Sequence, residues 1–331
     1  MKAMVINRFG GPEEFAPVEQ AVPEVSLGHV LIRVSGSSVN PVDWKLRSGL
    51  IPALAPEMPA VLHGDVAGRI EAVGPGVDDL QPGDEVYACA GGFKGLGGAL
   101  AEYMLADADL VAPKPATLSL KEAAVLPLVG ITAWESLIDR ARVEAGQRVL
   151  VHAGTGGVGH IGLQLAKCAG AIVYTTVSDE RKAEQARSLG ADEVINYREH
   201  TVAEYVQQHT RGEGFDVVFD TVGDDNLTGS FQAARAGGTV VTIAARSTQD
   251  LTTLHAKSIT LHCVFMGLPL ITGKGRVHHG DVLLRLGRLV DNGRIKPLID
   301  PQTFAFKDVG KAHQKLQDGR AMGKIALEAA F

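Results

Sequence analysis

Hydrophobic runs and amphipathic stretches alternate regularly along the chain from about residue 118 onward. Short apolar runs, typical of buried strands, lie at residues 148–152, 172–177, 193–195, 217–219 and 239–244. Stretches with helical periodicity follow them at residues 158–169, 180–189, 202–210 and 227–236. Strands that alternate with helices pair in parallel, because each helix carries the chain back across the sheet. The pattern therefore predicts an α/β fold: a doubly wound parallel sheet with helices on both faces.

The first third of the chain has strands and tight turns but no regular helices. Strands are predicted at residues 30–34, 66–73 and 85–87, with Pro-Gly turn signals at residues 74–76 and 81–84. A capping box, Ser119 followed by Glu122, predicts that a helix begins there. Beyond residue 266 the pattern predicts a helix at about 281–291 and a strand at 323–327. We therefore expect three parts, residues 1–118, 119–266 and 267–331.

Composition and charge narrow the class of protein. The 331 residues are 45% hydrophobic and 21% charged, which is typical of a globular chain long enough for two hydrophobic cores. A net charge of −6 argues against a groove that binds nucleic acid and against binding to an anionic membrane surface. It does not exclude a local basic patch, because net charge says nothing about the distribution of charges. Three scattered cysteines, interpreted as small buried hydrophobes, and the lack of a signal-like N-terminus predict a soluble cytoplasmic protein.

A glycine-rich loop joins the first strand of the α/β part to its first helix. Gly154, Gly156 and Gly159 have the G-x-G-x-x-G spacing, in the strand-to-helix context that a dinucleotide-binding fingerprint requires. The first glycine permits a tight turn, the second lets the backbone approach a pyrophosphate, and the third lets helix and strand pack closely. N–H groups at the helix N-terminus then face the anion. The alternative, a glycine-rich turn without a ligand, fits this context less well.

The end of the second α/β strand favours NADPH over NADH. Enzymes specific for NAD usually carry an acidic residue there, which holds the ribose 2′-hydroxyl. Here the strand ends in Val177 and Ser178, and the cations Arg181 and Lys182 follow. Such cations suit a 2′-phosphate, although they are also common in a solvated first helical turn. Asp179 would act as the acidic residue of an NAD enzyme if the strand ended one residue later.

Further motifs occur in a fixed order along the chain. They lie at residues 38–44 (SVNPVDW), 64–68 (GDVAG), 101–103 (AEY), 126–127 (LP), 132–133 (TA), 152–159, 189–192 (LGAD), 220–223 (DTVG) and 323–325 (GKI). On these motifs the chain resembles, over essentially its whole length, the quinone oxidoreductase (zeta-crystallin-like) branch of the medium-chain dehydrogenase/reductase superfamily. The resemblance implies a GroES-like catalytic domain at 1–118 and a Rossmann NADPH-binding domain at 119–266. It also implies a C-terminal segment, 267–331, that returns to the catalytic domain, and a homodimer joined through the cofactor-domain sheets.

The same resemblance implies which residues contact NADPH. Those expected at the pyrophosphate are Gly156, Gly157 and Val158. Those expected around the 2′-phosphate are Ser178, Lys182 and Tyr197, with a half-buried aromatic at a strand end as the alternative for Tyr197. Those expected nearer the nicotinamide are Thr132, Val222 and Ala244. Lys324 is expected to approach the cofactor from the C-terminal strand.

The sequence lacks the zinc ligands of the alcohol dehydrogenase branch of that superfamily. That branch carries a Cys, then a Gly-His-Glu segment, then a second Cys. Here Asn40 stands at the first Cys position and the segment reads His63-Gly64-Asp65, so Gly64 occupies the metal-histidine position. We expect His63, one step away on a strand, to point to the opposite face. His278 and His279 are interpreted as a solvated loop pair. Because a catalytic zinc needs three protein ligands, we expect no metal site.

Without zinc, the acceptor has to be electrophilic already, as in a quinone or an α,β-unsaturated ketone. Asn40 and Asp43 are candidates for the nicotinamide end of the site, and Trp44 for shaping the substrate side. The amide of Asn40 is suited to an oxyanion, although it is equally consistent with a turn residue before Pro41. Residues 49–53 carry no Tyr, so the sequence assigns no proton donor and leaves water as a candidate.

The predicted function is NADPH-dependent reduction of quinones or other conjugated carbonyls, without zinc. A reductase of alkenals or alkenones would use the same residues and differ only in its substrate. A polyketide-type enoyl reductase domain shares the fold. A non-catalytic NADPH-binding protein of crystallin type, from a different class, would keep the glycine loop and need no substrate site.

Overall fold

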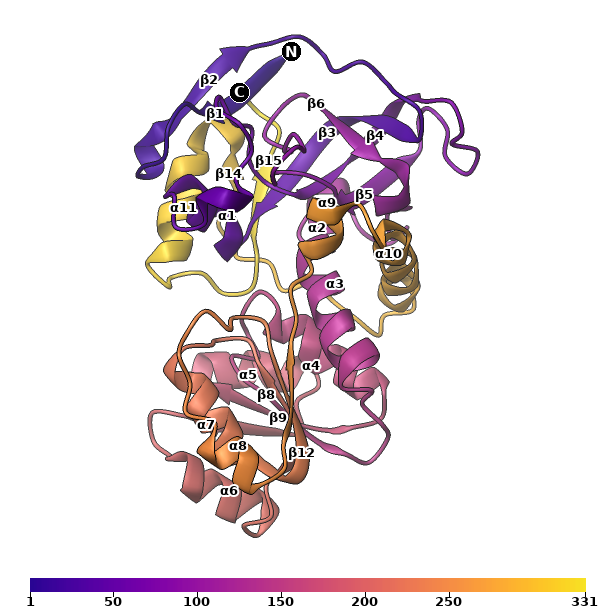
Figure 1. Cartoon of the computed structure of the whole chain (residues 1–331). Coiled ribbons are helices and arrows are strands. Elements are labelled where there is room, and N and C mark those ends of the chain that lie inside the picture. Colours follow the sequence, from indigo (N-terminus) through magenta and orange to yellow (C-terminus); the bar gives the residue numbers. More distant parts are fainter. The chain divides into compact units, whose positions relative to one another are not determined.

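The chain divides into two compact units. The computed structural model describes all 331 residues. The first unit comprises residues 1–131, 266–293 and 297–331, and the second comprises residues 132–265 and 294–296 (Figure 1). The first unit is therefore built from segments that are far apart in the sequence.

The first unit is built on a seven-stranded sheet. Along its main path the strands are β14 (Phe304–Ala305), β15 (Ile325–Glu328), β3 (His29–Val39), β4 (Asp65–Val73), β5 (Glu85–Cys89) and β7 (Val111–Pro113), and β6 (Tyr103–Asp107) also pairs with β3. A separate antiparallel pair consists of β1 (Lys2–Ile6) and β2 (Phe15–Glu19). The helices are α1 (Pro41–Arg47), α2 (Leu120–Ala123), α9 (Leu268–Thr272), α10 (Arg276–Asp291) and α11 (Val309–Gln317). Because β15 pairs with β3, the C-terminal strand completes a sheet that the first hundred residues begin.

The second unit is a six-stranded parallel sheet flanked by helices (Figure 1). In spatial order its strands are β10 (Glu193–Asn196), β9 (Ile172–Val177), β8 (Arg148–Val151), β11 (Phe215–Asp220), β12 (Ala234–Thr242) and β13 (Thr260–Cys263). Its helices are α4 (Gly159–Cys168), α5 (Glu180–Ser188), α6 (Val202–Thr210), α7 (Asp225–Ala233) and α8 (Thr252–Ala256). This is the Rossmann strand order 3-2-1-4-5-6, which reverses direction between β8 and β11. Ligands bind such sheets at the carboxyl ends of the strands where the order reverses.

The predicted fold class is confirmed. The strand predicted at residues 172–177 and the helix predicted at 202–210 have those bounds in the structure. The helix predicted at 227–236 ends earlier, at Ala233, because Ala234 already pairs with Phe215 as the first residue of β12. The edge strand β13 was not predicted, since its four residues include only one aliphatic side chain, Leu261.

The capping box at Ser119 begins a helix, but a short one. The Ser119 side chain accepts from the Glu122 N–H, and the Glu122 carboxylate accepts from the Ser119 N–H at 2.9 Å. Helix α2 ends at Ala123, and α3 (Pro127–Trp134) begins after a break at Pro127, which has no N–H to donate. Helix α2 packs on β3, β4, β5 and β15. Residues 119–131 therefore belong to the first unit, and the division falls at residues 131/132 instead of 118/119.

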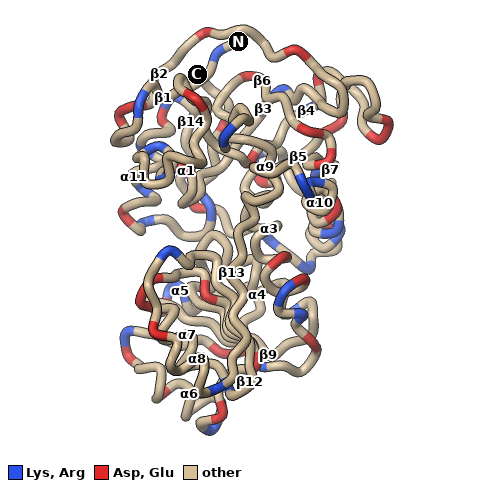
Figure 2. The backbone as a smooth tube through the Cα atoms, viewed as in Figure 1, with Lys and Arg blue, Asp and Glu red and all other residues tan.

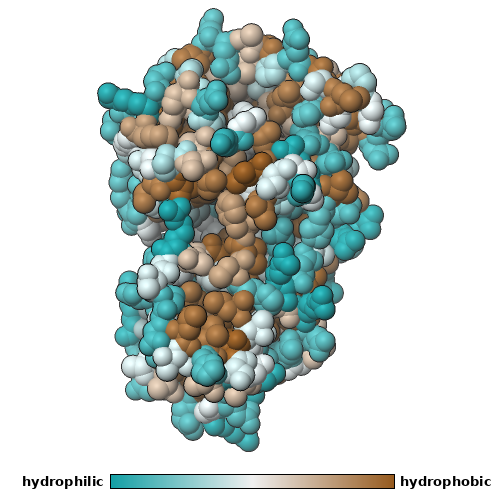
Figure 3. All heavy atoms as spheres, in the orientation of Figure 1, coloured by the Kyte–Doolittle hydropathy of each residue, from teal (hydrophilic) through white to brown (hydrophobic).

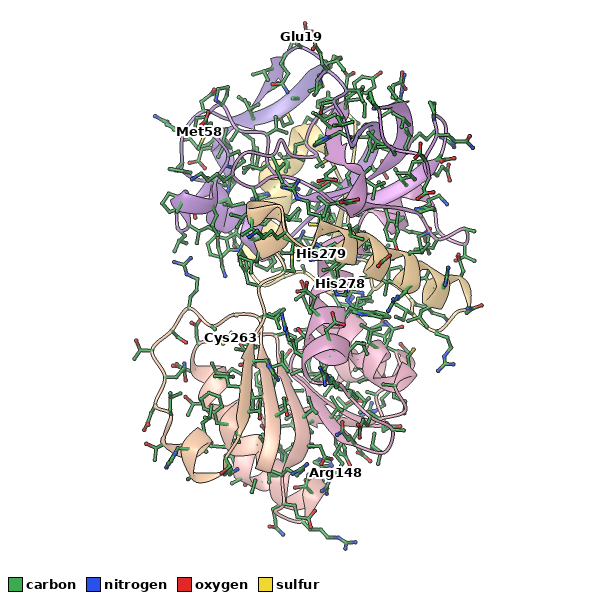
Figure 4. All side chains as sticks on the ribbon, turned by 45° about the vertical axis from the view of Figure 1, so that its right-hand side comes forward. Glu19, Met58, Arg148, Cys263, His278 and His279 are labelled. Carbon is green, nitrogen blue, oxygen red and sulfur yellow. The ribbon has the colours of Figure 1, made fainter.

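The two interpretations of surface histidines and buried cysteines need correction. His278 and His279 lie in the first turn of α10, not in a loop, and His279 is fully buried (Figure 4). Of the three free cysteines only Cys89 is buried, and Cys263 is exposed at the end of β13. The histidines were assigned to a loop because α10 begins at Arg276, before the predicted start at about residue 281. Cys263 ends a four-residue strand of mixed polarity, which was not predicted.

Lys and Arg positions alternate with Asp and Glu positions along the backbone of both units (Figure 2). None of the helices combines the length and the apolar character that a membrane span requires.

The third glycine of the loop gives a stability prediction for the second unit. A Cβ at Gly159 would lie 2.1 Å from the Ala153 carbonyl oxygen. Gly159→Ala is therefore expected to lower the free energy of unfolding by about 1–3 kcal/mol, as overpacking does. Gly229→Ala is the matched control, because in the interior of α7 its Cβ would meet nothing closer than Val202 at 3.4 Å. The control is expected to gain up to about 1 kcal/mol. Urea unfolding followed by circular dichroism measures both, and equal stabilities for the two variants would contradict the prediction.

Candidate functional site

A cluster of buried polar side chains lies in the first unit, where β3 ends and β4 begins. Asn40 directly follows β3, Asp65 is the first residue of β4, and Lys324 directly precedes β15. The pairing of β15 with β3 places Ile325 opposite Val39, which brings Lys324 beside Asn40. Asn40 and Asp65 have no exposed surface, and Lys324 is 2% exposed.

The Lys324 ammonium group is surrounded by oxygen atoms of the first unit. Its Nζ donates to the Val39 carbonyl at 3.0 Å and to Asn40 Oδ1, and it lies 3.6 Å from Asp65 Oδ2. Burial lowers the pKa of Lys324, while the Asp65 and Asp43 carboxylates oppose that change. A buried charge requires such acceptors, because the interior solvates it poorly.

Asp65 is the matching anion of the cluster. Its Oδ2 accepts from Ser38 Oγ at 2.6 Å and from Asn40 Nδ2 at 2.8 Å. Its Oδ1 accepts from the Leu128 N–H at 2.7 Å. Strands β3 and β4, helix α3 and the segment before β15 are therefore joined at one ion pair.

Asp43 and Trp44, the other predicted catalytic residues, lie in the first turn of α1. Asn40 is the N-cap residue of that helix, and its N–H donates to Asp43 Oδ2 at 2.7 Å. Burial raises the pKa of Asp43 to about 8. Trp44 is half-buried, with the Lys45 ammonium 5.8 Å from its ring centroid. Asn40 thus fits both interpretations made from the sequence, a residue that begins a turn before Pro41 and a member of a polar site.

We had expected His63 on a strand, but it lies in the irregular segment before β4, with φ at +73°. It is fully buried, and its Nε2 lies 2.8 Å from His313 Nε2 on α11. Its Nδ1 lies 4.0 Å from Asp43 Oδ2. Burial lowers the pKa of His63 to about 3 and that of His313 well below its usual value, so both rings are neutral at pH 7. His63 therefore pairs with a second imidazole.

The donor set of the first unit does not suit zinc. Gly64, at the metal-histidine position of the zinc branch, has no room for a side chain: a Cβ would lie 2.8 Å from the Gly91 carbonyl oxygen and 3.0 Å from Cys89 Sγ. Burial and the nearby carboxylates raise the pKa of the Cys89 thiol well above its usual value, which disfavours the thiolate that binds metal. Nowhere in the chain do three or more His, Cys, Asp or Glu side chains gather in an arrangement that could hold a metal ion.

The second unit carries a cavity of about 420 Å³ at the carboxyl edge of its sheet. It lies beside the position where the strand order reverses, since His152 follows β8 and Val222 follows β11. The residues that line it are His152, Ala153, Thr176, Tyr197, His200, Thr201, Val202, Tyr205, Val222 and Asn226. Position, size and mixed lining are those of a ligand site in an open α/β sheet.

The cavity edge has polar atoms that no protein group satisfies. His152 is 4% exposed, its Nδ1 lies 3.2 Å from Thr176 Oγ1, and its Nε2 has no hydrogen-bond partner. Burial lowers the pKa of His152 to about 4, so the ring is neutral. Asp220 uses Oδ1 to accept from Asn226 Nδ2 at 3.0 Å and from the N–H of Val222 at 2.9 Å, while its Oδ2 has no partner. Buried polar atoms without partners are rare and indicate a missing ligand or water.

The glycines of the loop allow other backbone and side-chain atoms to come close, but the individual glycines do not all have the roles predicted for them. The left-handed backbone of the turn is at Ala153, with φ at +53°, and not at Gly154. Gly154 is required instead because a Cβ would lie 2.0 Å from Thr175 Oγ1 of β9. At Gly159 a Cβ would lie 2.1 Å from the Ala153 carbonyl oxygen, so the close contact is between α4 and the loop and not, as expected, between helix and strand. At Gly156 the nearest atom to a Cβ would be the Ala153 carbonyl oxygen of the same loop, at 3.1 Å.

Ser178, Asp179 and Lys182 meet at the end of β9. Lys182 Nζ donates to Ser178 Oγ at 2.9 Å, and Ser178 Oγ donates to Asp179 Oδ2 at 2.8 Å. Asp179 is the N-cap of α5 and accepts from the Lys182 N–H at 3.0 Å. Two hydrogen bonds hold the pKa of Asp179 below its usual value: the one from the Ser178 hydroxyl has the larger effect, and the one from the Lys182 N–H the smaller. The carboxylate that an NAD enzyme would offer to the ribose is therefore already bonded as a helix cap.

The structure brings some of the predicted cofactor residues together. Tyr197 and Val222, about half exposed, line the cavity, whereas Thr132 and Ala244 lie outside its lining. His152 was missed as a site residue, although it directly precedes the glycine loop. Asp65 was also missed, although it ends the His-Gly-Asp segment that stands in place of the Gly-His-Glu of the zinc branch. Polar residues at the strand ends that flank a recognised motif are the signal that would have found both.

Known proteins match this chain over nearly its whole length. Residues 26–116 match the alcohol dehydrogenase GroES-like domain, and residues 189–327 match a family described as zinc-binding dehydrogenase. The chain is 34% identical to the chloroplastic NADPH-dependent alkenal/one oxidoreductase of Arabidopsis thaliana, over 99% of this chain and 79% of that protein. It is 31% identical to the quinone oxidoreductase of Homo sapiens, over 99% and 97% of the two chains.

A solved structure shows the same fold. The Escherichia coli quinone oxidoreductase, crystallised in complex with NADPH, superposes with a TM-score of 0.89 at 29% identity, over 99% of this chain and 100% of that one.

Proposed function

Because the chain belongs to the zinc-independent, quinone oxidoreductase-like branch of the medium-chain dehydrogenase/reductase superfamily, we propose that it reduces quinones or other conjugated carbonyls with NADPH. The observation that carries the proposal is the carboxyl edge of the second sheet. The cavity there is lined by Ala153 of the dinucleotide loop and by Thr176 of β9. At the end of β9 the Lys182 ammonium group binds Ser178, while the acidic cap Asp179 is already bonded.

The residues at this edge fit NADPH. Ser178 and Lys182 would hold the 2′-phosphate, with Tyr197 beside it. The loop N–H groups at the start of α4 would hold the pyrophosphate. His152 Nε2, which lacks a partner, offers the adenosine portion a polar contact within the cavity. When bound, NADPH supplies the hydride.

The first unit supplies a polar site without metal ligands. A substrate there has to be electrophilic by its own conjugation, as a quinone or an enone is. Hydride addition leaves an enolate or a hydroquinone anion, which is stabilised by a preorganised donor and then takes a proton. We assign that donor role to the Asn40 amide, and to Trp44, at the surface of α1, the role of shaping the substrate side. Asp43 supports Asn40 through its backbone N–H.

A substrate panel tests the proposed function. Purified protein should oxidise NADPH steadily with 1,4-quinones or with short alkenones and should ignore saturated alcohols with NADP⁺. Turnover should survive prolonged treatment with a zinc chelator, because the chain has no ligand set for the metal. Absorbance at 340 nm follows the reaction.

The outcomes of the panel separate the alternatives. Turnover of enones alone would identify an alkenal/one reductase, like the Arabidopsis relative. Binding of NADPH without turnover of any acceptor would identify a non-catalytic binding protein and refute the proposal. Loss of activity on chelation, restored by zinc, would refute the zinc-independent mechanism.

Lys182→Ala tests the choice of cofactor. Removing a hydrogen bond to a charged phosphate costs roughly 1.5–3 kcal/mol, or about a 10- to 150-fold loss of NADPH affinity. Its side chain is 35% exposed, so the loss should shrink as salt increases. Affinity for NADH should change little. Isothermal titration with both cofactors measures this.

Arg181→Ala is the matched control, since Arg181 is the neighbouring cation and is exposed. It should leave both affinities near wild type. An equal loss of NADPH and NADH affinity in Lys182→Ala would contradict the assignment. A wild-type preference for NADH would point to Asp179.

We also propose a homodimer formed through β13. This strand pairs only with β12, so its other edge leaves backbone N–H and C=O groups free to pair with a second copy. Phe265, just beyond the strand, is 48% exposed, and hydrophobic residues gather on the face of the second unit seen in Figure 3. Sedimentation equilibrium should give a dimer at micromolar concentration and a shift toward monomer in Phe265→Lys. A wild-type monomer would refute the assembly.

We also propose a cytoplasmic location. The three cysteines are free and one of them is exposed, which is consistent with a reducing compartment.

A further inference from the structure

We infer that Lys324 is a positioning residue for Asn40: its ammonium group fixes the Asn40 amide in one orientation and places a positive charge beside the group to which we assign the substrate oxygen. This inference rests on the proposed function, since it names how the reductase site is prepared. It replaces the expectation that Lys324 contacts the cofactor. The ammonium already donates to the Val39 carbonyl and to Asn40 Oδ1 and forms an ion pair with Asp65, and all three partners lie in the first unit.

The partners of Asn40 allow only one orientation of its amide. Lys324 can only donate and the Asp65 carboxylate, when ionised, can only accept. Lys324 therefore binds Oδ1, and Asp65 binds Nδ2 at 2.8 Å. A flipped amide would bring N–H groups against an ammonium and an oxygen against a carboxylate. In the allowed orientation the second N–H of Nδ2 makes no hydrogen bond in the structure. Because Asn40 has no exposed surface, this N–H meets a substrate oxygen only after the substrate displaces the side chains that cover it.

The backbone holds Lys324 rigidly in this place. Its N–H donates to the Leu298 carbonyl at 2.9 Å, and its carbonyl accepts from the Asp300 N–H at 2.8 Å. Gly323 before it has φ at +71°, and a Cβ there would lie 2.1 Å from the Leu298 carbonyl oxygen. Only glycine allows the chain to pass at this distance. The Lys324 side chain is therefore fixed at its backbone and at its ammonium group, as preorganised stabilisation of an anion requires.

The Lys324 ammonium group lies beside residues that correspond to metal-site residues of the zinc branch. Asn40 and Asp65 stand at the positions where the zinc branch carries its Cys and the Glu of Gly-His-Glu. Here an ammonium group binds the oxygens of both residues. A fixed positive charge thus remains at a site without metal ligands, where it stabilises Asp65 and the anion that forms on the substrate. In the buried site such a charge acts more strongly than in water.

Lys324→Met is the first test, because Met keeps the length of the side chain but has no charge and no N–H. We expect kcat with a quinone or an enone to fall about 100-fold, the loss that removal of one oxyanion donor causes. The Kd of NADPH should stay within about twofold, because Lys324 is assigned no contact with it. Unchanged kcat, or a loss confined to NADPH affinity, would overturn the inference.

A double variant separates positioning from stability. Lys324→Met leaves Asp65 as an uncompensated buried charge, so the free energy of unfolding of that variant should fall. Asp65→Asn/Lys324→Met removes both charges and should recover stability in urea unfolding. Its kcat should stay low, because no ammonium group binds Asn40 Oδ1. Recovery of kcat together with stability would show that Lys324 is only structural.

Combination with Asn40→Ala tests whether Lys324 acts through Asn40. If it does, Asn40→Ala/Lys324→Met should lose no more kcat than Asn40→Ala alone. Multiplied losses in the double variant would mean that the two residues act independently and would overturn the positioning role.

A binding measurement gives a readout other than turnover. 4-Nitrophenol imitates the product anion, and its absorbance reports whether it is ionised. On wild-type protein saturated with NADP⁺ its pKa should fall below that in solution, and in Lys324→Met the pKa should rise again by about one unit, or tenfold in the ionisation constant. No binding to the wild type, or the same pKa in both, would overturn the inference. If the wild type reduces no quinone or enone, the proposed function fails, and the phenol measurement then decides the role of Lys324 by itself.

Discussion

A positive charge buried away from water needs acceptors on every side, and the first unit is arranged around one. The Lys324 ammonium takes its acceptors from the end of β3 and the start of β4, and Asp65 in turn is held by the first turn of α3. No single segment could satisfy this ion pair. The arrangement therefore holds together four stretches of chain, and loss of either partner would leave an unpaired charge in the interior. The same interactions orient Asn40, so stability and the proposed chemistry depend on one set of contacts.

The sequence could predict what is local and periodic. The α/β alternation, the glycine loop and the capping box at Ser119 depend on neighbours within one or two turns of helix, and the structure contains all of them. Strand β13 was missed because only four residues with mixed polarity form it. The buried cluster could not be derived in the same way: Asn40 and Asp65 are 25 residues apart, and Lys324 is 284 residues from Asn40. Nothing in a local pattern reports which distant residues will meet, so Lys324 was assigned to the cofactor from resemblance alone.

Motif rules also describe chemistry better than they describe geometry. The loop has the glycines that a dinucleotide fingerprint requires, yet the residue in the left-handed conformation is Ala153, and Gly154 is required by Thr175 on the next strand. Asp179 shows the same limit. Its place near the strand end leaves its role open in the sequence, and the structure decides it because the carboxylate accepts the Lys182 N–H as a helix cap. In both cases the packing of a neighbouring element, which the motif does not include, determines the role of the residue.

The pairing of β15 with β3 has a consequence for synthesis on the ribosome. Strand β3 leaves the exit tunnel long before the residues that will cover it, since Lys324 lies 285 residues beyond Val39. At 5–20 residues per second, translation of that interval takes roughly 15–60 s. Throughout it, one edge of the first sheet has no partner, while the second unit, whose residues 132–265 are continuous, can already fold. The nascent chain thus carries an open strand edge for most of its synthesis, the period in which chaperone binding or pairing with another nascent chain would compete with native folding.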